Sequence, residues 1–514
     1  MSNPQKESLF VLIKSLSKSE KRQFKLYVGR FEGNADSKYL ALFTFLDKSQ
    51  EYDEQAILQK KIVTKQQLSN LKANLYKQIL KSLRLNPAQH NIRITIREQL
   101  DYATILYNKG LYTQSLKLLD KAKLLAMEHE EKNIAYEIVE LEKIIETQYI
   151  TRSIRSRANV LAKEAKSLSI QNTLTSKLSN LSLQLYGILL KTGYVKNEED
   201  YDTITAYFHK RLPKFSMSQL GFREKLWLYK AHLWYSFLTQ DFLASYKYAN
   251  KWVDLFRASE KMIEINPVFY LKGNHYLLES LFFIKHESKF NEVLLQLELD
   301  LKNEVIPKND NTEVLGFLYV YMNKLNYHFL KGSFSEGLYL VAEINKNIAR
   351  YENRIDQHHV MVFYYKIASL YFGAGDTKNC IAYLQKIITN KSLKVREDLL
   401  CFARILNLVA HYELGLDYHL ETQLKSTYKY LLKMDDLQDV QKEMIKFLRS
   451  LGDIYPHEIK KAFEGLHAKL KTYESDPYER RAFLYLDIIS WLESKIQNKP
   501  VAEIIQAKAK ELIR

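Results

Sequence analysis

Residues 103–122 read ATILYNKGLYTQSLKLLDKA, with a single glycine between two apolar-periodic segments. On both sides of Gly110 the apolar residues are spaced three and four apart, which is the spacing of one buried helix face. The small residues Ala103 and Ser115 allow two helices to approach closely, and Tyr112 fills the space between them. The stretch therefore predicts a pair of helices joined by a short turn at the glycine.

The same pattern recurs along the chain. Copies with a turn glycine occupy residues 325–344, 368–387 and 408–427, and weaker copies surround Gln240 and Ser288. The predicted turn positions are 110, 240, 288, 332, 375 and 415, so the last five recur every 40 to 48 residues. Gly193 fills most of the first gap. A regular recurrence of this length predicts a stack of helix pairs from about residue 95 to 435.

These segments resemble tetratricopeptide (TPR) repeats in the spacing of their small, aromatic and glycine residues. The resemblance covers about two thirds of the chain, and it implies an all-α superhelix of helix pairs whose first helices line a concave groove. The period is longer than the 34 residues of that family, and the proline that usually closes each repeat is absent. We therefore expect a divergent, TPR-like α-solenoid.

Composition supports this expectation and suggests three parts. With 15 Gly and 8 Pro in 514 residues, the chain has few turn formers, which favours long helices with short links. We expect a basic N-terminal helical domain over 1–88, the helical repeats over 89–435, and C-terminal capping helices over 436–514. In the last part, residues 480–496 predict an amphipathic helix that places Phe483, Leu486, Ile489 and Leu492 on one side.

Several classes of protein have no support in the sequence. The start is polar and no long apolar run occurs, so we expect neither a signal peptide nor a membrane span, and the default location is cytoplasmic. The two cysteines form no CxxC motif, and no hydrolase, metalloprotease or nucleotide-binding motif is found. His358 and His359 are adjacent, so on a helix they point about 100° apart and cannot easily share a metal. We expect no catalytic residue, no metal and no cofactor.

One aromatic stripe is a candidate binding surface. The residue three positions before each predicted turn is aromatic in five of six copies: Tyr107, Phe237, Phe329, Phe372 and Tyr412, with Lys285 as the exception. By the TPR resemblance, this position on the first helix of each pair faces the groove. The alternative is that these aromatic side chains pack between neighbouring helix pairs as part of the core.

The N-terminal region has a different chemistry. Residues 1–100 contain 18 Lys and Arg against 9 Asp and Glu. Ser17 with Glu20, and Thr64 with Gln67, have the spacing of capping boxes and predict helix starts at Lys18 and Lys65. The second helix follows a short helix and a turn, and it carries a polar stripe opposite its apolar side: Asn70, Asn74, Lys77, Lys81 and Arg84.

Two functional hypotheses follow. The first is a non-enzymatic scaffold or adaptor that binds a protein or peptide in the groove of the solenoid. The second is a nucleic-acid-binding regulator with an N-terminal helix-turn-helix and a TPR-like sensor or dimerisation domain, because Asn, Lys and Arg on one helix face are suited to bases and phosphates. A lysine-rich helix that is simply solvated on its outer side is the alternative for that stripe.

Overall fold

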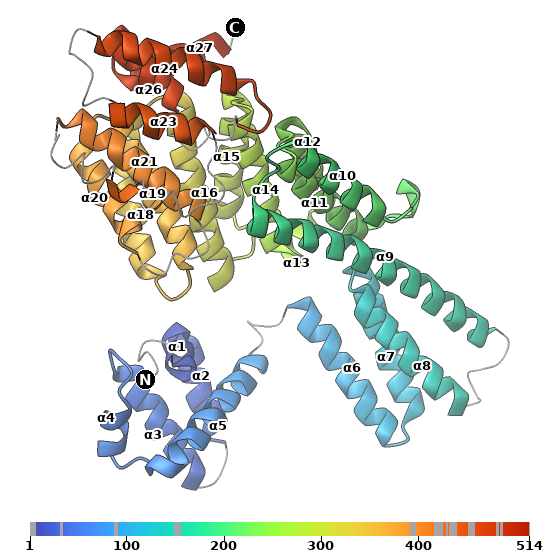
Figure 1. The fold of residues 1–514 in the computed structure, drawn as a ribbon. Coiled ribbons are helices and arrows are strands. Elements are labelled where there is room, and N and C mark those ends of the chain that lie inside the picture. The colour runs from blue at the N-terminus through green and yellow to red at the C-terminus, as the bar shows by residue number, and fades with distance from the viewer. Residues whose placement is uncertain are drawn as a thin grey trace. The chain divides into compact units, whose positions relative to one another are not determined.

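The structure is a computed structural model, and it describes residues 7–30, 34–86, 91–148, 156–390, 397–415, 425–427, 430, 439–450, 458–479, 483 and 487–512. The chain is all-helical, and the described residues contain no strand. It divides into two compact units, Met1–Leu168 and Ser169–Arg514 (Figure 1). The expected domain boundaries at residues 88 and 435 both lie outside the described residues.

The first unit begins with five helices around a core of their own: α1 (Ser8–Ser15), α2 (Lys18–Val28), α3 (Asn34–Lys48), α4 (Glu54–Gln59) and α5 (Lys65–Arg84). The predicted capping box at α2 is confirmed, because Ser17 and Glu20 exchange both hydrogen bonds. Thr64 is the N-cap of α5 as expected, but its side chain makes no capping hydrogen bond. Helix α5 contacts α1, α2 and α3, and its buried residues include Leu75 and Ile79.

The predicted helix pair at Gly110 forms in the second half of this unit. Helices α6 (Ile92–Asn108), α7 (Tyr112–Glu128) and α8 (Lys132–Gln148) pack in sequence, and Gly110 has a φ of 73°, which favours glycine. The Ser115 hydroxyl donates a 2.7 Å hydrogen bond to the Ala103 carbonyl oxygen, and both residues are fully buried. The small residues thus allow the close approach that the sequence predicts.

A single helix, α9 (Arg157–Thr192), belongs to both units. Its first turns bury Leu161 and Leu168 in the core of α6–α8, and later turns bury Leu181 in the core of the second unit. The intervening residues 169–177 contain no buried side chain.

The second unit is built from helix pairs. Their first helices are α11 (Phe222–Leu238), α14 (Pro267–Phe283), α16 (Asp310–Lys331), α19 (Gln357–Gly373) and α21 (Glu397–Glu413). The second helices are α12 (Phe242–Arg257), α15 (Glu287–Lys302), α18 (Tyr339–Arg350) and α20 (Thr377–Ile388). Helix α10 (Glu198–Arg211) precedes them, and the short helices α13 (Lys261–Ile265) and α17 (Phe334–Gly337) lie in connections. First helices of consecutive pairs contact each other, as α14 with α16 and α16 with α19.

Left-handed residues mark the turns within these pairs. They are Gln240, Gly332, Gly375 and Gly415 as predicted, with φ between 57° and 81°. The predicted turn at Ser288 is wrong, because Ser288 lies inside α15 and the left-handed residue is Lys285, with a φ of 55°. The second half of the copy at 408–427 lies largely outside the described residues.

The C-terminal helices pack back onto the helix pairs. They are α23 (Asp439–Ser450), α24 (Ile459–Glu474), α26 (Ile488–Gln497) and α27 (Val501–Leu512). Helix α26 begins at Ile488, so it covers only the later part of the expected 480–496 helix, and Leu486 is outside the described residues. Trp491 Nε1 donates a 2.7 Å hydrogen bond to Glu413 on α21. Gln506 on α27 donates a 3.1 Å hydrogen bond to the Gly332 carbonyl oxygen at the end of α16.

Candidate binding cavity

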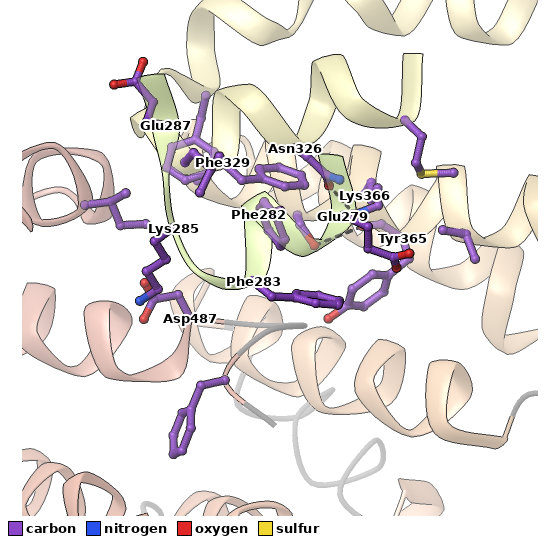
Figure 2. Close-up of a pocket in the computed structure, with 18 of the residues that line it drawn as sticks. Glu279, Phe282, Phe283, Lys285, Glu287, Asn326, Phe329, Tyr365, Lys366 and Asp487 are labelled. Carbon is purple, nitrogen blue, oxygen red and sulfur yellow. Dashed lines mark hydrogen bonds between the residues drawn. The ribbon is translucent and has the colours of Figure 1, made fainter. Parts of the chain in front are cut away.

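The second unit contains a cavity of about 690 Å³ between three consecutive first helices and the C-terminal helix (Figure 2). Helices α14, α16 and α19 form one wall, and Val501, Ile505 and Ala509 on α27 contribute to another. Three aromatic residues in equivalent positions line it: Phe282, Phe329 and Phe372. We call this space the aromatic cavity.

The equivalence of the three phenylalanines follows from the turns. Phe282, Phe329 and Phe372 each lie three residues before a left-handed residue, namely Lys285, Gly332 and Gly375. Each is half-buried and contributes to the lining of the cavity. The sequence pattern does not indicate Phe282, because it predicts the turn three residues too late, at Ser288. With the correct turn, the stripe is aromatic in all six copies around turns 110, 240, 285, 332, 375 and 415.

A chain of polar side chains crosses the wall of the aromatic cavity. Lys366 Nζ donates a 2.6 Å hydrogen bond to Asn326 Oδ1, and Asn326 Nδ2 donates to Asn323 Oδ1 at 3.2 Å. Asn323 Nδ2 in turn donates to His275 Nδ1 at 3.2 Å. Burial lowers the pKa of His275 to about 3, so its ring is neutral at pH 7 and can accept this bond. All donors in the chain point the same way, from the lysine toward the histidine.

Lys366 is the most unusual charge in this wall. Its Nζ lies 5.6 Å from the Phe282 ring centroid and 5.5 Å from that of Phe329, which is cation–π range. Burial lowers its pKa to about 8, although nearby Glu279 opposes that shift. An ammonium has three N–H donors, and Asn326 is its hydrogen-bond acceptor among the described residues. The lysine therefore keeps donor capacity in a desolvated, aromatic environment.

The predicted groove residues divide between this cavity and the core. Phe329 and Phe372 line the aromatic cavity. Phe237 is only 3% exposed and packs edge-on against Phe283 at 6.2 Å, which leaves no free ring face for a ligand. Tyr412 is half-buried beside Phe463. Tyr107 lies in the first unit, where its hydroxyl donates to Gln148 at 3.1 Å.

The polar stripe of α5 is on the surface of the first unit. Asn70, Lys77, Lys81 and Arg84 are exposed, and Asn74 is half-buried and donates a 3.0 Å hydrogen bond to Asn70. Arg84 forms a 2.8 Å ion pair with Asp101 on α6. Four residues of the stripe are therefore exposed, and one of these, Arg84, is already paired with an acid.

His358 and His359, at the start of α19, also line the aromatic cavity. His359 Nδ1 lies 2.6 Å from Asp356 Oδ2 at the N-cap of α19, and His358 is its neighbour on the same helix. Within the described part of the chain, no group of three or more His, Cys, Asp or Glu residues has the geometry to hold a metal ion. In the same residues, no helix has the length and apolar character needed to cross a membrane.

Comparisons with protein-family models, with curated proteins and with solved structures found no match to this chain.

Proposed function

We propose that this chain is a non-enzymatic scaffold or adaptor with a TPR-like solenoid, and that its aromatic cavity binds a peptide segment of a protein partner. The observation that carries the proposal is the convergence of Phe282, Phe329 and Phe372, from three consecutive helices, on one cavity. A volume of about 690 Å³ accommodates several side chains of a short segment.

The apolar part of the recognition comes from the exposed ring faces. Aromatic residues in partly dry pockets are frequent hot spots, and their truncation typically costs more than about 1 kcal/mol of binding free energy. The three rings belong to rigid helices, so little conformational entropy is lost when a ligand packs against them.

The polar part comes from Lys366 and favours an acidic side chain or carboxylate in the peptide. An anion beside this ammonium would use its remaining donors in a low-dielectric environment, where a charge-assisted hydrogen bond contributes about 1.5 to 3 kcal/mol. Because Asn326 and the rings of Phe282 and Phe329 already hold the ammonium, it needs little reorganisation on binding.

The test is selection of peptides by the full-length chain from a random display library, followed by fluorescence polarisation with the selected sequence. We expect Phe329→Ala with Phe372→Ala to weaken binding at least about tenfold. Lys366→Met should weaken an acidic peptide but change little for its Glu-to-Gln counterpart. Matched controls are Leu243→Ala, which removes a 69% exposed side chain from α12, and Lys346→Met, whose side chain is 76% exposed on α18.

Two results would remove the proposal. One is failure of the folded chain to select any peptide. The other is equal affinity of the cavity variants and the two surface controls.

A further inference from the structure

The first unit carries a second surface whose chemistry differs from that of the aromatic cavity. One side of helix α5 is buried in the protein, and the opposite side is exposed. The buried side carries Leu68, Leu71, Leu75 and Ile79. That exposed side carries Gln66, Asn70, Ala73, Lys77 and Lys81. Twenty residues of helix extend about 30 Å, so the face is long enough to follow a nucleic-acid groove.

The preceding turn has the layout of a helix-turn-helix. Helix α4 is short and buries Ile57 completely, and Val63 in the turn joins the same core as Leu68 at the start of α5. Asp53 caps α4 by accepting hydrogen bonds from the backbone N–H groups of Gln55 and Ala56. The turn thus holds the N-terminal end of α5 in a fixed position at the surface.

Some lysines of α1–α5 are paired with acids, whereas the exposed lysines around the α4–α5 turn and along α5 are paired with no acid that the structure describes. Lys21 pairs with Asp47 at 2.7 Å, and Lys72 lies 3.4 Å from Glu7, so these acids are already neutralised. Around the turn and along α5, by contrast, a set of exposed lysines forms no ion pair with any described residue: Lys60, Lys61, Lys65, Lys77 and Lys81. The surface is therefore positively charged where α5 is most accessible.

Lys61 adds a separate observation. Its φ is 53°, a left-handed conformation that costs a non-glycine residue roughly 1 kcal/mol or more. Glycine would avoid this cost; the same unit has a left-handed glycine at Gly110 and a left-handed non-glycine residue at Glu130, with a φ of 59°. Other helix ends of the chain have left-handed non-glycine residues as well, so strain alone does not single out Lys61; its exposed charge beside α5 is what joins it to the lysines of that helix.

We propose that the face of α5, with the lysines of the α4–α5 turn, binds duplex DNA by inserting α5 into the major groove. The major groove of B-DNA is about 12 Å wide and admits one α-helix, whereas the deep, narrow major groove of A-form RNA does not. Single strands are usually held by exposed aromatic rings, whereas the large exposed apolar side chains that the structure describes between residues 7 and 86 are Leu26, Leu80 and Leu85. Lysines contact phosphates, while Gln66 and Asn70 face the base edges.

The experiment is fluorescence anisotropy of the full-length chain with a labelled duplex of about 20 base pairs, at salt concentrations from about 50 to 200 mM. Five phosphate contacts predict a slope of log affinity against log salt near −4.5, at about −0.9 per contact. Lys77→Gln with Lys81→Gln should flatten that slope by about 2. The control pair Lys18→Gln with Lys25→Gln removes the same charge from exposed positions on α2 and should leave the slope nearly unchanged.

Lys61→Gly separates binding from folding. It should raise the melting temperature, because strain is relieved, and still flatten the slope by about 1. Absence of DNA binding at about 50 mM salt would overturn the proposal. Equal effects of the α5 and α2 lysine pairs would also overturn it, as would equal affinity for duplex RNA.

Discussion

Lys230 is a lysine whose ammonium group is largely buried against aromatic rings. Its ammonium lies 4.0 Å from the ring centroid of Trp227 and 4.7 Å from that of Phe269, and no hydrogen-bond acceptor for it is found among the described residues. Burial, with a smaller effect of Lys272, lowers its pKa to about 7. Cation–π attraction to the aromatic faces offsets part of the free energy lost when the ammonium is desolvated. It does not replace the hydrogen bonds that the ammonium would make with water.

We therefore predict that Lys230→Met stabilises the protein by about 1 to 2 kcal/mol near pH 7, because a similar apolar volume replaces a desolvated charge. An unfolded lysine titrates near 10.4, so between about pH 7 and 10 the unfolded wild-type chain binds one more proton than the folded chain. The contribution of Lys230 to the free energy of unfolding of the wild-type protein therefore increases with pH between about pH 7 and 10. The Lys230→Met variant has no such increase. Urea unfolding of both proteins at several pH values measures the difference; parallel pH curves would contradict it.

Lys366 gives the corresponding prediction for binding. Its pKa of about 8 in the free protein means that the ammonium is lost as pH rises past that value. If an anion of the peptide meets this group, affinity should fall above about pH 8 by up to roughly tenfold per pH unit. Fluorescence polarisation of the selected peptide from pH 6 to 10 measures this. Lys366→Met should give a flat profile, and a wild-type profile that is also flat would contradict an anion at this position.

At the scale of helices, the sequence predicted the elements better than the contacts between them. Turn glycines and the capping residues Ser17 and Glu20 act locally, so their positions can be recognised in one sequence. Without a glycine, the position of a turn depends on the flanking pattern alone. That pattern located the turn at Gln240 but placed the turn at Lys285 three residues late, at Ser288.

The candidate site was predicted only in part for the same reason. Phe329 and Phe372 follow from the repeat, whereas the hydrogen bond between Lys366 and Asn326 joins two helices 40 residues apart. Nothing in the spacing of an Asn and a Lys in separate repeats distinguishes a buried pair from two surface residues. Tertiary packing alone brings them together.

The docking of α27 on α16 gives a prediction about elements. A Cβ at Gly332 would lie 3.0 Å from the Ala502 carbonyl oxygen and 3.1 Å from Gln506 Cγ, whereas a Cβ at Gly375 meets nothing within 4 Å. Both glycines are left-handed, so alanine at either costs about 1 to 2 kcal/mol in backbone strain. Gly332→Ala should cost about 1 to 2 kcal/mol more, because α27 must shift. Chemical unfolding of the two variants measures this, and equal losses would show that α27 does not rest on this turn.

For the whole molecule, the arrangement of cores bears on how the chain unfolds. The core of α1–α5, the core of α6–α8 and the main core of the second unit form separate clusters of buried residues. Helix α9 runs from one unit into the other, but residues 169–177 hold no buried side chain. Within this stretch Leu174 packs against a small cluster of the second unit, and Thr175 donates a 2.7 Å hydrogen bond to Glu224 of that unit. A helical stretch with so little burial contributes well under 1 kcal/mol per residue, so it transmits little stability between its ends.

We therefore predict that the full-length chain unfolds in more than one calorimetric transition, and that core variants shift them separately. Leu75 and Leu277 are both fully buried, one in the core of α1–α5 and the other in the second unit. Truncation of either to alanine should cost about 2 to 5 kcal/mol within its own unit. Leu75→Ala should lower only the transition of the first unit, and Leu277→Ala only that of the second. If either substitution moved every transition together, α9 would have to couple the two units far more strongly than its unburied middle allows.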